Sequence, residues 1–561
     1  MINKKNIDTY LQLESINLLD NFSYLLPQID GYEKHDFRNS DRVIHDLARR
    51  EADDRSHERS HVKTNQNNLS EASANSYSES IAIGTENLAK ITIGSGNDII
   101  FGLAEANAVS KAQAIAQAKS LSDYASTANA DSQSISQSLA LATGISNVSK
   151  IDTGSGNDII FGLAKANAVS EAQAIAKAKL FLDNAYNANA NSESIAETIA
   201  GAVGIANSGW LLTDGGNDII VGVANTSTAT QASAQAKAIL KTSGFDDVLD
   251  LLEAQSTSNA IAIAQTQIFG INNSGKIFTG HGSDSILGLA NSKNLSDARA
   301  FSKTKVISNS LATATAEGSA NAVVNGEAVG IVNSGYINTG KGHDTITGLA
   351  VNDPVAIASA DAEAMSMAND NDSESDTFSF SDTSEAVAIG INNSLGAIYT
   401  GRGNDRISGY ASTVGILGGE IYTGKGRDRI VGKGSSVGII DSTIYAGAGN
   451  DYLQAAIIEI DPSTGNSAMS EDQTGSISNA QLYGNNGHDT FDIGGFAGNV
   501  LIDGGKDFDV LQLWGNVDDY LISLGSDGLT LTIEDSGSVL TARNIEEFYF
   551  EGERHSIENF A

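Results

Sequence analysis

The chain of 561 residues is strongly acidic: 34 Lys and Arg stand against 69 Asp and Glu, giving a formal charge of −35 at pH 7. This excess argues against capture of nucleic acid or of an anionic membrane, because both need clustered cations. The absence of cysteine excludes disulfides, thiolate zinc sites and a cysteine nucleophile. With 57 Gly and only 3 Pro, the composition favours strands joined by tight turns.

Residues 1–75 are polar and rich in Asp, Arg, His and Asn, which predicts an N-terminal region that is disordered or only partly helical. The first lysines are not followed by the apolar segment of a signal peptide, and no run approaches the roughly 18 apolar residues that span a bilayer. We therefore expect either an internal protein or export that does not read the N-terminus. His57 and His61 fit the zinc-protease pattern His-Glu-x-x-His, but their polar surroundings argue against a catalytic domain.

One sequence motif recurs along the chain. It first runs Ile93-Gly-Ser-Gly-Asn-Asp98-Ile-Ile-Phe-Gly102 and returns from Thr153 to Gly162. Its aspartates are Asp98, Asp158, Asp218, Asp284, Asp344, Asp405, Asp428 and Asp451, with weaker copies at Asp489 and Asp509. The first eight are spaced by 60, 60, 66, 60 and 61 residues and then by 23 and 23, so the long coils carry an insert of roughly 37 residues. This periodicity predicts one repeat body over residues 76–509.

The short repeats show the basic unit, which is two or three β-rich runs separated by glycine turns. Such a unit cannot bury its own apolar face, but stacked copies can, with Ile421, Ile430, Ile444 and Leu453 in inward-facing columns. We therefore predict an all-β, right-handed parallel β-solenoid, or β-roll, with one coil per repeat.

The inserts alternate with a period of two. From Ala104 to Ser120 every even position is Ala or Ser, and the next repeat copies this from Ala166 to Ala178. Steps of two visit every face of a helix but only one face of a strand. We predict long strands with small side chains inside, although the composition leaves helical arms as the alternative. The acidic residues 355–385 are expected to form a solvated loop, and the strand-rich residues 510–561 a C-terminal cap.

The Gly-x-Gly-x-Asp turn has the chemistry of a calcium site. Its glycines allow sharp turns that expose carbonyl oxygens, and its aspartate adds a charged oxygen, so two stacked turns offer the oxygen ligands that Ca²⁺ prefers. The candidate ligands are Gly94, Gly96, Asp98, Gly154, Gly156, Asp158, Gly216, Asp218, Gly280, Gly282, Asp284, Gly340, Gly342, Asp344, Gly401, Gly403, Asp405, Gly424, Gly426, Asp428, Gly447, Gly449, Asp451, Gly487, Asp489 and Asp509.

These turns resemble the RTX (repeats-in-toxin) nonapeptide Gly-Gly-x-Gly-x-Asp-x-U-x, where U is a large apolar residue. The resemblance implies a parallel β-roll that holds Ca²⁺. Segments such as Asn544-Ile-Glu-Glu-Phe-Tyr-Phe also resemble the region that follows RTX arrays, which implies an uncleaved C-terminal signal read by the type I secretion machinery. The chain departs from the family in carrying one motif per coil, and in having Asp214, Asn485 and Asp507 where glycines belong.

Together these features predict a secreted or cell-surface RTX-type structural protein that folds on extracellular Ca²⁺, with cell-surface polysaccharide or matrix as its expected partner. We expect no enzymatic activity, because no nucleophile elbow or other catalytic motif accompanies the array. The alternative is a polysaccharide-active enzyme, or an RTX exoprotein or toxin, that uses the array as its scaffold.

Overall fold

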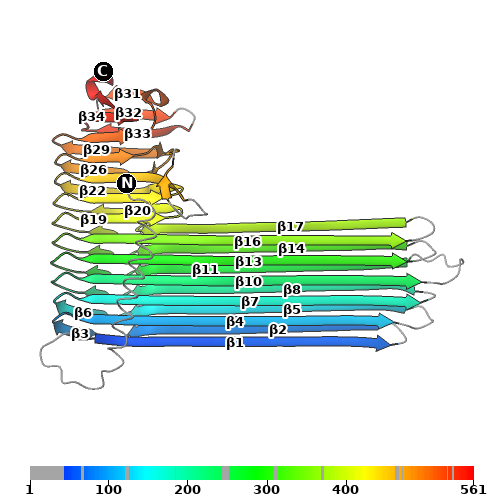
Figure 1. The fold of residues 1–561 in the computed structure, drawn as a ribbon. Coiled ribbons are helices and arrows are strands. Elements are labelled where there is room, and N and C mark those ends of the chain that lie inside the picture. Colours follow the sequence, from blue (N-terminus) through cyan, green and yellow to red (C-terminus); the bar gives the residue numbers. More distant parts are fainter. Residues whose placement is uncertain are drawn as a thin grey trace.

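The computed structural model describes residues 43–560 except 65–67, 121–125, 183–184, 243–251, 308–311, 368–371, 461–466, 471, 527 and 534–535. These residues form an all-β parallel solenoid, which confirms the predicted fold class. A tall column of coils runs the length of the molecule, and a long flat arm projects from its N-terminal half (Figure 1).

Each coil consists of one strand in a first sheet, one strand in a second sheet, and a short strand that leads into the turn before the next coil. In one long coil these are β4 (Ile99–Ser120), β5 (Ser126–Asn147) and β6 (Lys150–Ser155). Residues of β4 pair in parallel with residues exactly one repeat later in β7 (Ile159–Leu182), so that Ala104 lies beside Ala164. The repeat spacing in the sequence therefore sets the register.

The first sheet continues through both long and short coils. Its strands are β1 (Val43–Thr64), β4, β7, β10 (Ile219–Thr242), β13 (Ser285–Ile307), β16 (Thr345–Met367), β19 (Arg406–Ala411), β21 (Arg429–Gly434), β23 (Tyr452–Ile460), β27 (Thr490–Ile493), β30 (Val510–Leu513), β34 (Glu547–Phe550) and β35 (Glu553–Ser556). The small strand β24 (Ser467–Met469) pairs with β23 outside this order.

The second sheet covers the facing side of the arm and two sides of the column. Its long strands are β2 (Asn68–Asn87), β5, β8 (Ala185–Asn207), β11 (Leu252–Asn273), β14 (Ala312–Asn333) and β17 (Asp372–Asn392). Its shorter strands are β3 (Ile91–Ser95), β6, β9 (Trp210–Leu212), β12 (Lys276–Phe278), β15 (Tyr336–Asn338), β18 (Ala397–Tyr399), β20 (Val414–Tyr422), β22 (Val437–Ala448), β25 (Ile477–Ser478), β26 (Gln481–Asn486), β28 (Phe496–Ala497) and β29 (Asn499–Lys506).

The arm is a two-sheet sandwich with a thin interior of alanine and serine. Along β4 the even positions from Ala104 to Ser120 are buried, and the odd positions between them are only partly covered. The period-two alternation therefore forms strands, as predicted, and the helical alternative is wrong. Serines inside the arm bond across the gap between the sheets; for example, Ser134 donates to the carbonyl of Ala112 at 2.8 Å.

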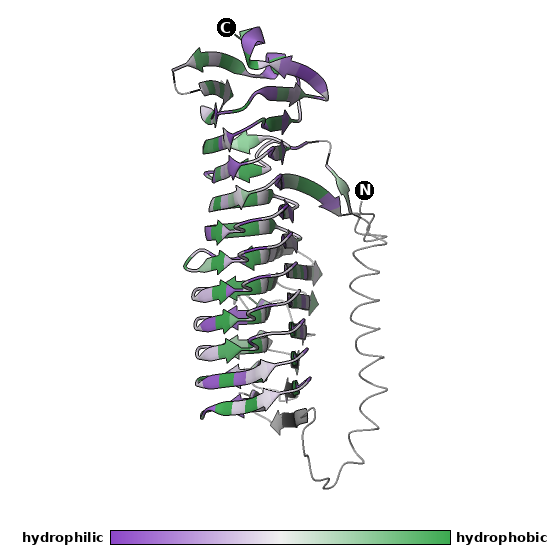
Figure 2. Ribbon diagram, turned by 90° about the vertical axis from the view of Figure 1, so that its left-hand side faces the viewer, coloured by the Kyte–Doolittle hydropathy of each residue, from purple (hydrophilic) through white to green (hydrophobic). Residues whose placement is uncertain are grey.

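The column has a different core, made of stacked isoleucines. The predicted columns through Ile421, Ile430, Ile444 and Leu453 are fully buried. Hydrophobic segments of successive coils lie above one another (Figure 2). A buried asparagine ladder runs beside them, in which each Nδ2 donates to the Oδ1 of the next coil, as from Asn207 to Asn273 at 2.7 Å.

Two facing lines of glycine, which we call the glycine waist, separate the isoleucine core from the alanine core. Its members are Gly102, Gly162, Gly222, Gly288, Gly348, Gly409 and Gly432 on the first sheet, and Gly144, Gly204, Gly270, Gly330, Gly390, Gly415 and Gly438 on the second. A Cβ added to Gly330 would lie 2.4 Å from the backbone nitrogen of Leu349 and 2.6 Å from the carbonyl oxygen of Gly390. The sheets therefore approach so closely here that no side chain fits between them.

Two sequence expectations need correction. The polar N-terminal region was expected to reach residue 75, but β1 pairs with β4 over its whole length and β2 begins at Asn68, because main-chain pairing with the next coil does not require apolar side chains. Residues 1–42 lie outside the described residues. His57 and His61 lie in strand β1, where four residues span about 13 Å, so they do not form a helical zinc motif.

The expected loop at 355–385 is also largely strand, belonging to β16 and β17 on either side of residues 368–371. This is the last long coil, and the next coil pairs only with its column end, at residues 345–350 of β16 and 389–392 of β17. Phe378 and Phe380 occupy positions that are Gly318 and Ala320 in the preceding strand, yet both are 62% exposed. Asp382 and Glu385 are exposed on the same strand. Acidic side chains on an uncovered edge oppose strand addition by another chain.

The C-terminal end changes from parallel to antiparallel pairing. The strands β31 (Leu521–Gly525), β32 (Gly528–Ile533) and β33 (Ser538–Arg543) form an antiparallel meander, and β34 pairs antiparallel with β35. Two short 3₁₀ helices, η1 (Val517–Asp519) and η2 (Ile557–Phe560), complete this end. Among the residues that the structure describes, no helix has the length and hydrophobicity to cross a membrane.

Candidate functional site: the aspartate column

The Gly-x-Gly-x-Asp turns stack at one edge of the column. Backbone bridges join the middle residues of successive turns, from Ser155 through Gly215, His281, Lys341, Arg402 and Lys425 to Ala448. All of the predicted glycines adopt positive φ, between 87° and 149°. The irregular copies keep this shape, because Asp214, Asn485 and Asp507 also adopt positive φ, of 56°, 76° and 82°. The prediction of one motif per coil along a single edge is confirmed.

The ten predicted aspartates form one continuous line, which we call the aspartate column. Its members, from Asp98 to Asp509, are at most 2% exposed, so their side chains point into the solenoid. In each coil the Asp Oδ1 accepts a hydrogen bond from the backbone N–H of the aspartate in the coil before. The distances are 2.8 Å from Asp405 to Asp428 and 2.8 Å from Asp428 to Asp451. The stacking predicted for these three residues is confirmed.

The second carboxylate oxygen is the unusual feature of the column. In Asp451, Asp489 and Asp509, Oδ2 is buried and no described group donates a hydrogen bond to it. In Asp218, Asp284, Asp344, Asp405 and Asp428, Oδ2 is equally buried, and the donor beside the carboxyl group is the hydroxyl of a threonine five residues earlier. A buried carboxylate oxygen without a partner is costly, and more so when carboxylates of like charge lie in the neighbouring coils. The column therefore presents a line of buried carboxyl oxygens with few hydrogen-bond donors.

The pKa values of the column reflect this environment. Burial, with a contribution from the neighbouring Asp428 and Asp344, raises the pKa of Asp405 to about 7. Burial likewise raises the pKa of Asp451 to about 7, with Asp489 and Asp428 adding to the shift. Near neutral pH these carboxyls are thus balanced between holding a proton and carrying a charge that needs a counter-ion.

The turn carbonyls are mostly engaged in bonds between coils. The carbonyl of Gly340 accepts from the N–H of Arg402 at 3.1 Å, and that of Lys425 accepts from Gly403 at 2.7 Å. The carbonyl oxygen of Gly282 lies where a Cβ on Gly342 would sit, since the two would be 1.4 Å apart. The outer asparagines also bond along the stack; for example, Asn157 Oδ1 accepts from the N–H of Asn217 at 2.7 Å.

These residues fit a calcium ion in donor type. The sequence predicted ions between stacked turns, held by carbonyls and aspartates, whereas the aspartate side chains are buried inside the solenoid. The buried Oδ2 atoms are hard oxygens, which suit Ca²⁺. Within the described part of the chain, however, no group of three or more His, Cys, Asp or Glu side chains is arranged to hold a metal. A cation would therefore lie between the Oδ2 atoms of two successive coils, such as those of Asp405 and Asp428.

Two parts of the site were not identified from the sequence. Glu546 ends the column, since its Oε2 accepts the backbone N–H of Asp509 at 2.8 Å. Buried threonines stand five residues before six of the ten aspartates, and Thr153 Oγ1 donates to Asp158 Oδ2 at 2.5 Å. The recurring Thr-Gly of the repeats was the available signal for the threonines. No sequence signal marked Glu546, because it lies outside the repeat.

No protein-family model, curated protein or solved structure matches this chain. The aspartate column and its surroundings are therefore the basis for any functional argument.

Proposed function

We propose that the protein is a secreted, RTX-type structural or surface protein whose solenoid is stabilised by Ca²⁺ bound along the aspartate column. The single observation that supports this is the line of buried carboxyl groups, whose Oδ2 atoms have at most a threonine hydroxyl as donor among the described residues. Each coil that folds brings another carboxylate beside those already buried, and a shared dication relieves both the desolvation and the repulsion. Extracellular modules bind Ca²⁺ in the range of roughly 0.1–1 mM. Secretion through a type I system and partnership with cell-surface polysaccharide or matrix belong to the same proposal.

The experiment compares thermal unfolding, followed by circular dichroism, in chelator, in about 10 mM Ca²⁺ and in about 10 mM Mg²⁺. We expect Ca²⁺ to stabilise the fold by roughly 1.5–3 kcal/mol for each occupied site, and Mg²⁺ to do so much less. Direct metal counting on the folded protein gives the number of ions. Identical unfolding curves in chelator and in Ca²⁺ would remove the proposal.

The variant Asp405→Asn makes the test specific for the column. Asparagine keeps an oxygen for the N–H of Asp344, which donates to Asp405 at 2.9 Å, but removes the charge. We expect this variant to be more stable than the parent in chelator and to gain less from Ca²⁺. The matched control is Asp441→Asn, because Asp441 is exposed in a neighbouring short coil, and its response to Ca²⁺ should equal that of the parent. Equal responses of all three proteins would place calcium elsewhere.

A further inference from the structure

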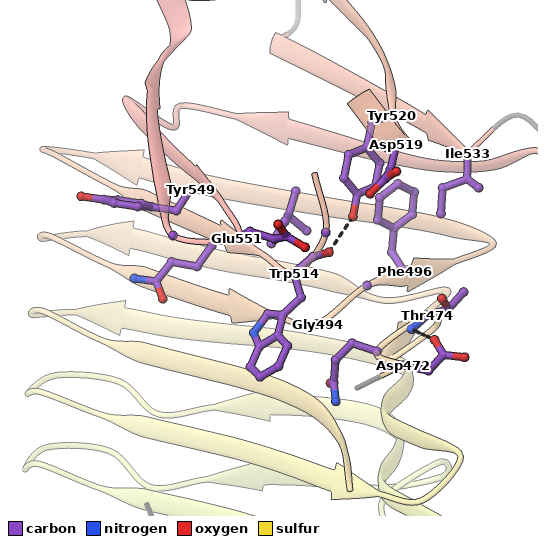
Figure 3. Close-up of a pocket in the computed structure, with 16 residues that line it drawn as sticks. Asp472, Thr474, Gly494, Phe496, Trp514, Asp519, Tyr520, Ile533, Tyr549 and Glu551 are labelled. Atoms are coloured by element: carbon purple, nitrogen blue, oxygen red, sulfur yellow. Dashed lines mark hydrogen bonds between the residues drawn. The ribbon is translucent and has the colours of Figure 1, made fainter. Parts of the chain in front are cut away.

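A hollow of about 800 Å³ lies where the last coils meet the C-terminal cap. Its walls come from the segment around Asp472, the end of β30 with Trp514, the region of η1 with Asp519 and Tyr520, and the turn between β34 and β35 with Glu551 (Figure 3). It is distinct from the aspartate column, whose members do not line it. Concave sites with aromatic walls and a few convergent polar groups are typical of small-ligand binding.

The aromatic side of the hollow is held in place by packing within the cap. The Tyr520 hydroxyl donates to the carbonyl of Trp514 at 3.0 Å, and its ring stacks on Phe496 with centroids 5.7 Å apart. Burial raises the pKa of Tyr520 to about 12, so this hydroxyl stays a donor. Trp514 is 41% exposed, so part of its side chain is open to a ligand.

The polar side of the hollow is acidic. Asp472, Asp519 and Glu551 line it, and no Lys, Arg or His is among the residues that the structure places around it. In Figure 3 Glu551 and Asp472 are seen on either side of Trp514. The N–H of Thr474 donates to Asp472 at 2.9 Å and lowers the pKa of this carboxyl, which keeps it charged. Three carboxylates without a basic partner repel anions and attract cations.

We infer that this hollow binds an organic cation, namely an alkylammonium group placed over the Trp514 indole and balanced by Glu551 and Asp472. Tryptophan is the best aromatic partner for a cation, and such contacts strengthen when the cation is partly desolvated. An alkylammonium carries both the charge that the carboxylates need and the apolar surface that an indole covers. The inference does not rest on calcium binding by the aspartate column.

The two tryptophans of the chain provide the assay. Trp210 lies far along the column, so in a Trp210→Phe background the fluorescence reports only on Trp514. Choline is titrated against its neutral carbon analogue 3,3-dimethylbutan-1-ol, at constant Ca²⁺, with glucose as a neutral sugar. We expect choline to shift the Trp514 emission in a saturable way and the neutral analogue to bind at least about tenfold more weakly. Added salt should lower the affinity for choline. Co-sedimentation with phosphatidylcholine vesicles distinguishes a lipid headgroup from a free ligand as the source of the ammonium.

Two variants locate the site. Glu551→Gln should weaken choline binding by about threefold to tenfold, while Glu553→Gln, an exposed neighbour in β35 that does not line the hollow, should leave it unchanged. Trp514→Phe, followed by calorimetry, should weaken binding but preserve the unfolding midpoint. The inference is overturned if choline and its neutral analogue bind equally, if glucose binds instead, if nothing binds to the folded protein, or if Glu551→Gln and Glu553→Gln behave alike.

Discussion

We expect replacement of Gly330 by alanine to lower the free energy of unfolding by about 3 kcal/mol or more, which is among the largest effects open to a single methyl group. The added Cβ would lie within 2.8 Å of backbone atoms of Leu349, Gly390 and Gly348 on both sheets. Backbone on two sides cannot rotate away as a side chain can. The sheets would have to separate, which opens the isoleucine core on one side of the waist and the alanine core on the other.

The control is Gly201→Ala. Gly201 also lies in a long strand of the second sheet, but its added Cβ would meet only the end of the Leu141 side chain at 2.8 Å, with the Gln267 carbonyl oxygen at 3.7 Å. We expect this variant to be neutral or slightly stabilising, since Leu141 can change rotamer. Chemical denaturation of both variants in the same Ca²⁺ concentration measures the difference. Equal stabilities would contradict the close approach of the two sheets at the glycine waist.

The glycine waist also shows which features can be predicted from the sequence and which cannot. The motif ending at Gly102 predicted the repeat period, the position of the turn and the strand register, because these are local properties repeated at a fixed spacing. The reason for Gly102 itself is not local: its partner Gly144 comes from the other sheet, and an added Cβ would lie 2.2 Å from the Gly144 carbonyl oxygen. Only the packing of two sheets reveals that a glycine in a strand marks close approach rather than a bulge.

The aspartate column, too, could be predicted from the sequence only in part. Spacing predicted that Asp405, Asp428 and Asp451 stack, and they do. It did not predict that the carboxylates point inward and bond to the main chain, because a turn residue can face either way. The N-terminal strand β1 was missed for another reason: its polar sequence carries no alternation of its own, and pairing with β4 supplies the order. Side-chain direction and strand formation that depend on a neighbouring coil cannot be predicted from the sequence of the segment alone.

Without calcium, we expect the protein to become more stable as the pH is lowered from about 8 to about 5. Asp218, Asp405, Asp451 and Asp509 have folded pKa values raised to about 7, chiefly by burial, from an ordinary value of 3.8. The folded state therefore binds protons more tightly than the unfolded chain. Stability is gained as pH falls through about 7, is complete below the unfolded pKa, and is lost again as pH rises.

The measurement is the thermal midpoint in calcium-free buffer across this pH range, where we expect a rise of roughly 5–10 °C toward pH 5. Millimolar Ca²⁺ should reverse the trend, because protons and Ca²⁺ compete for the same oxygens, so its stabilising effect shrinks as pH falls. The double variant Asp405→Asn/Asp451→Asn should weaken the dependence of the midpoint on pH and on Ca²⁺, because these two positions no longer titrate while Asp218 and Asp509 still do. A calcium-free midpoint that falls steadily from pH 8 to pH 5 would mean that the column is already neutralised by contacts other than protons or cations.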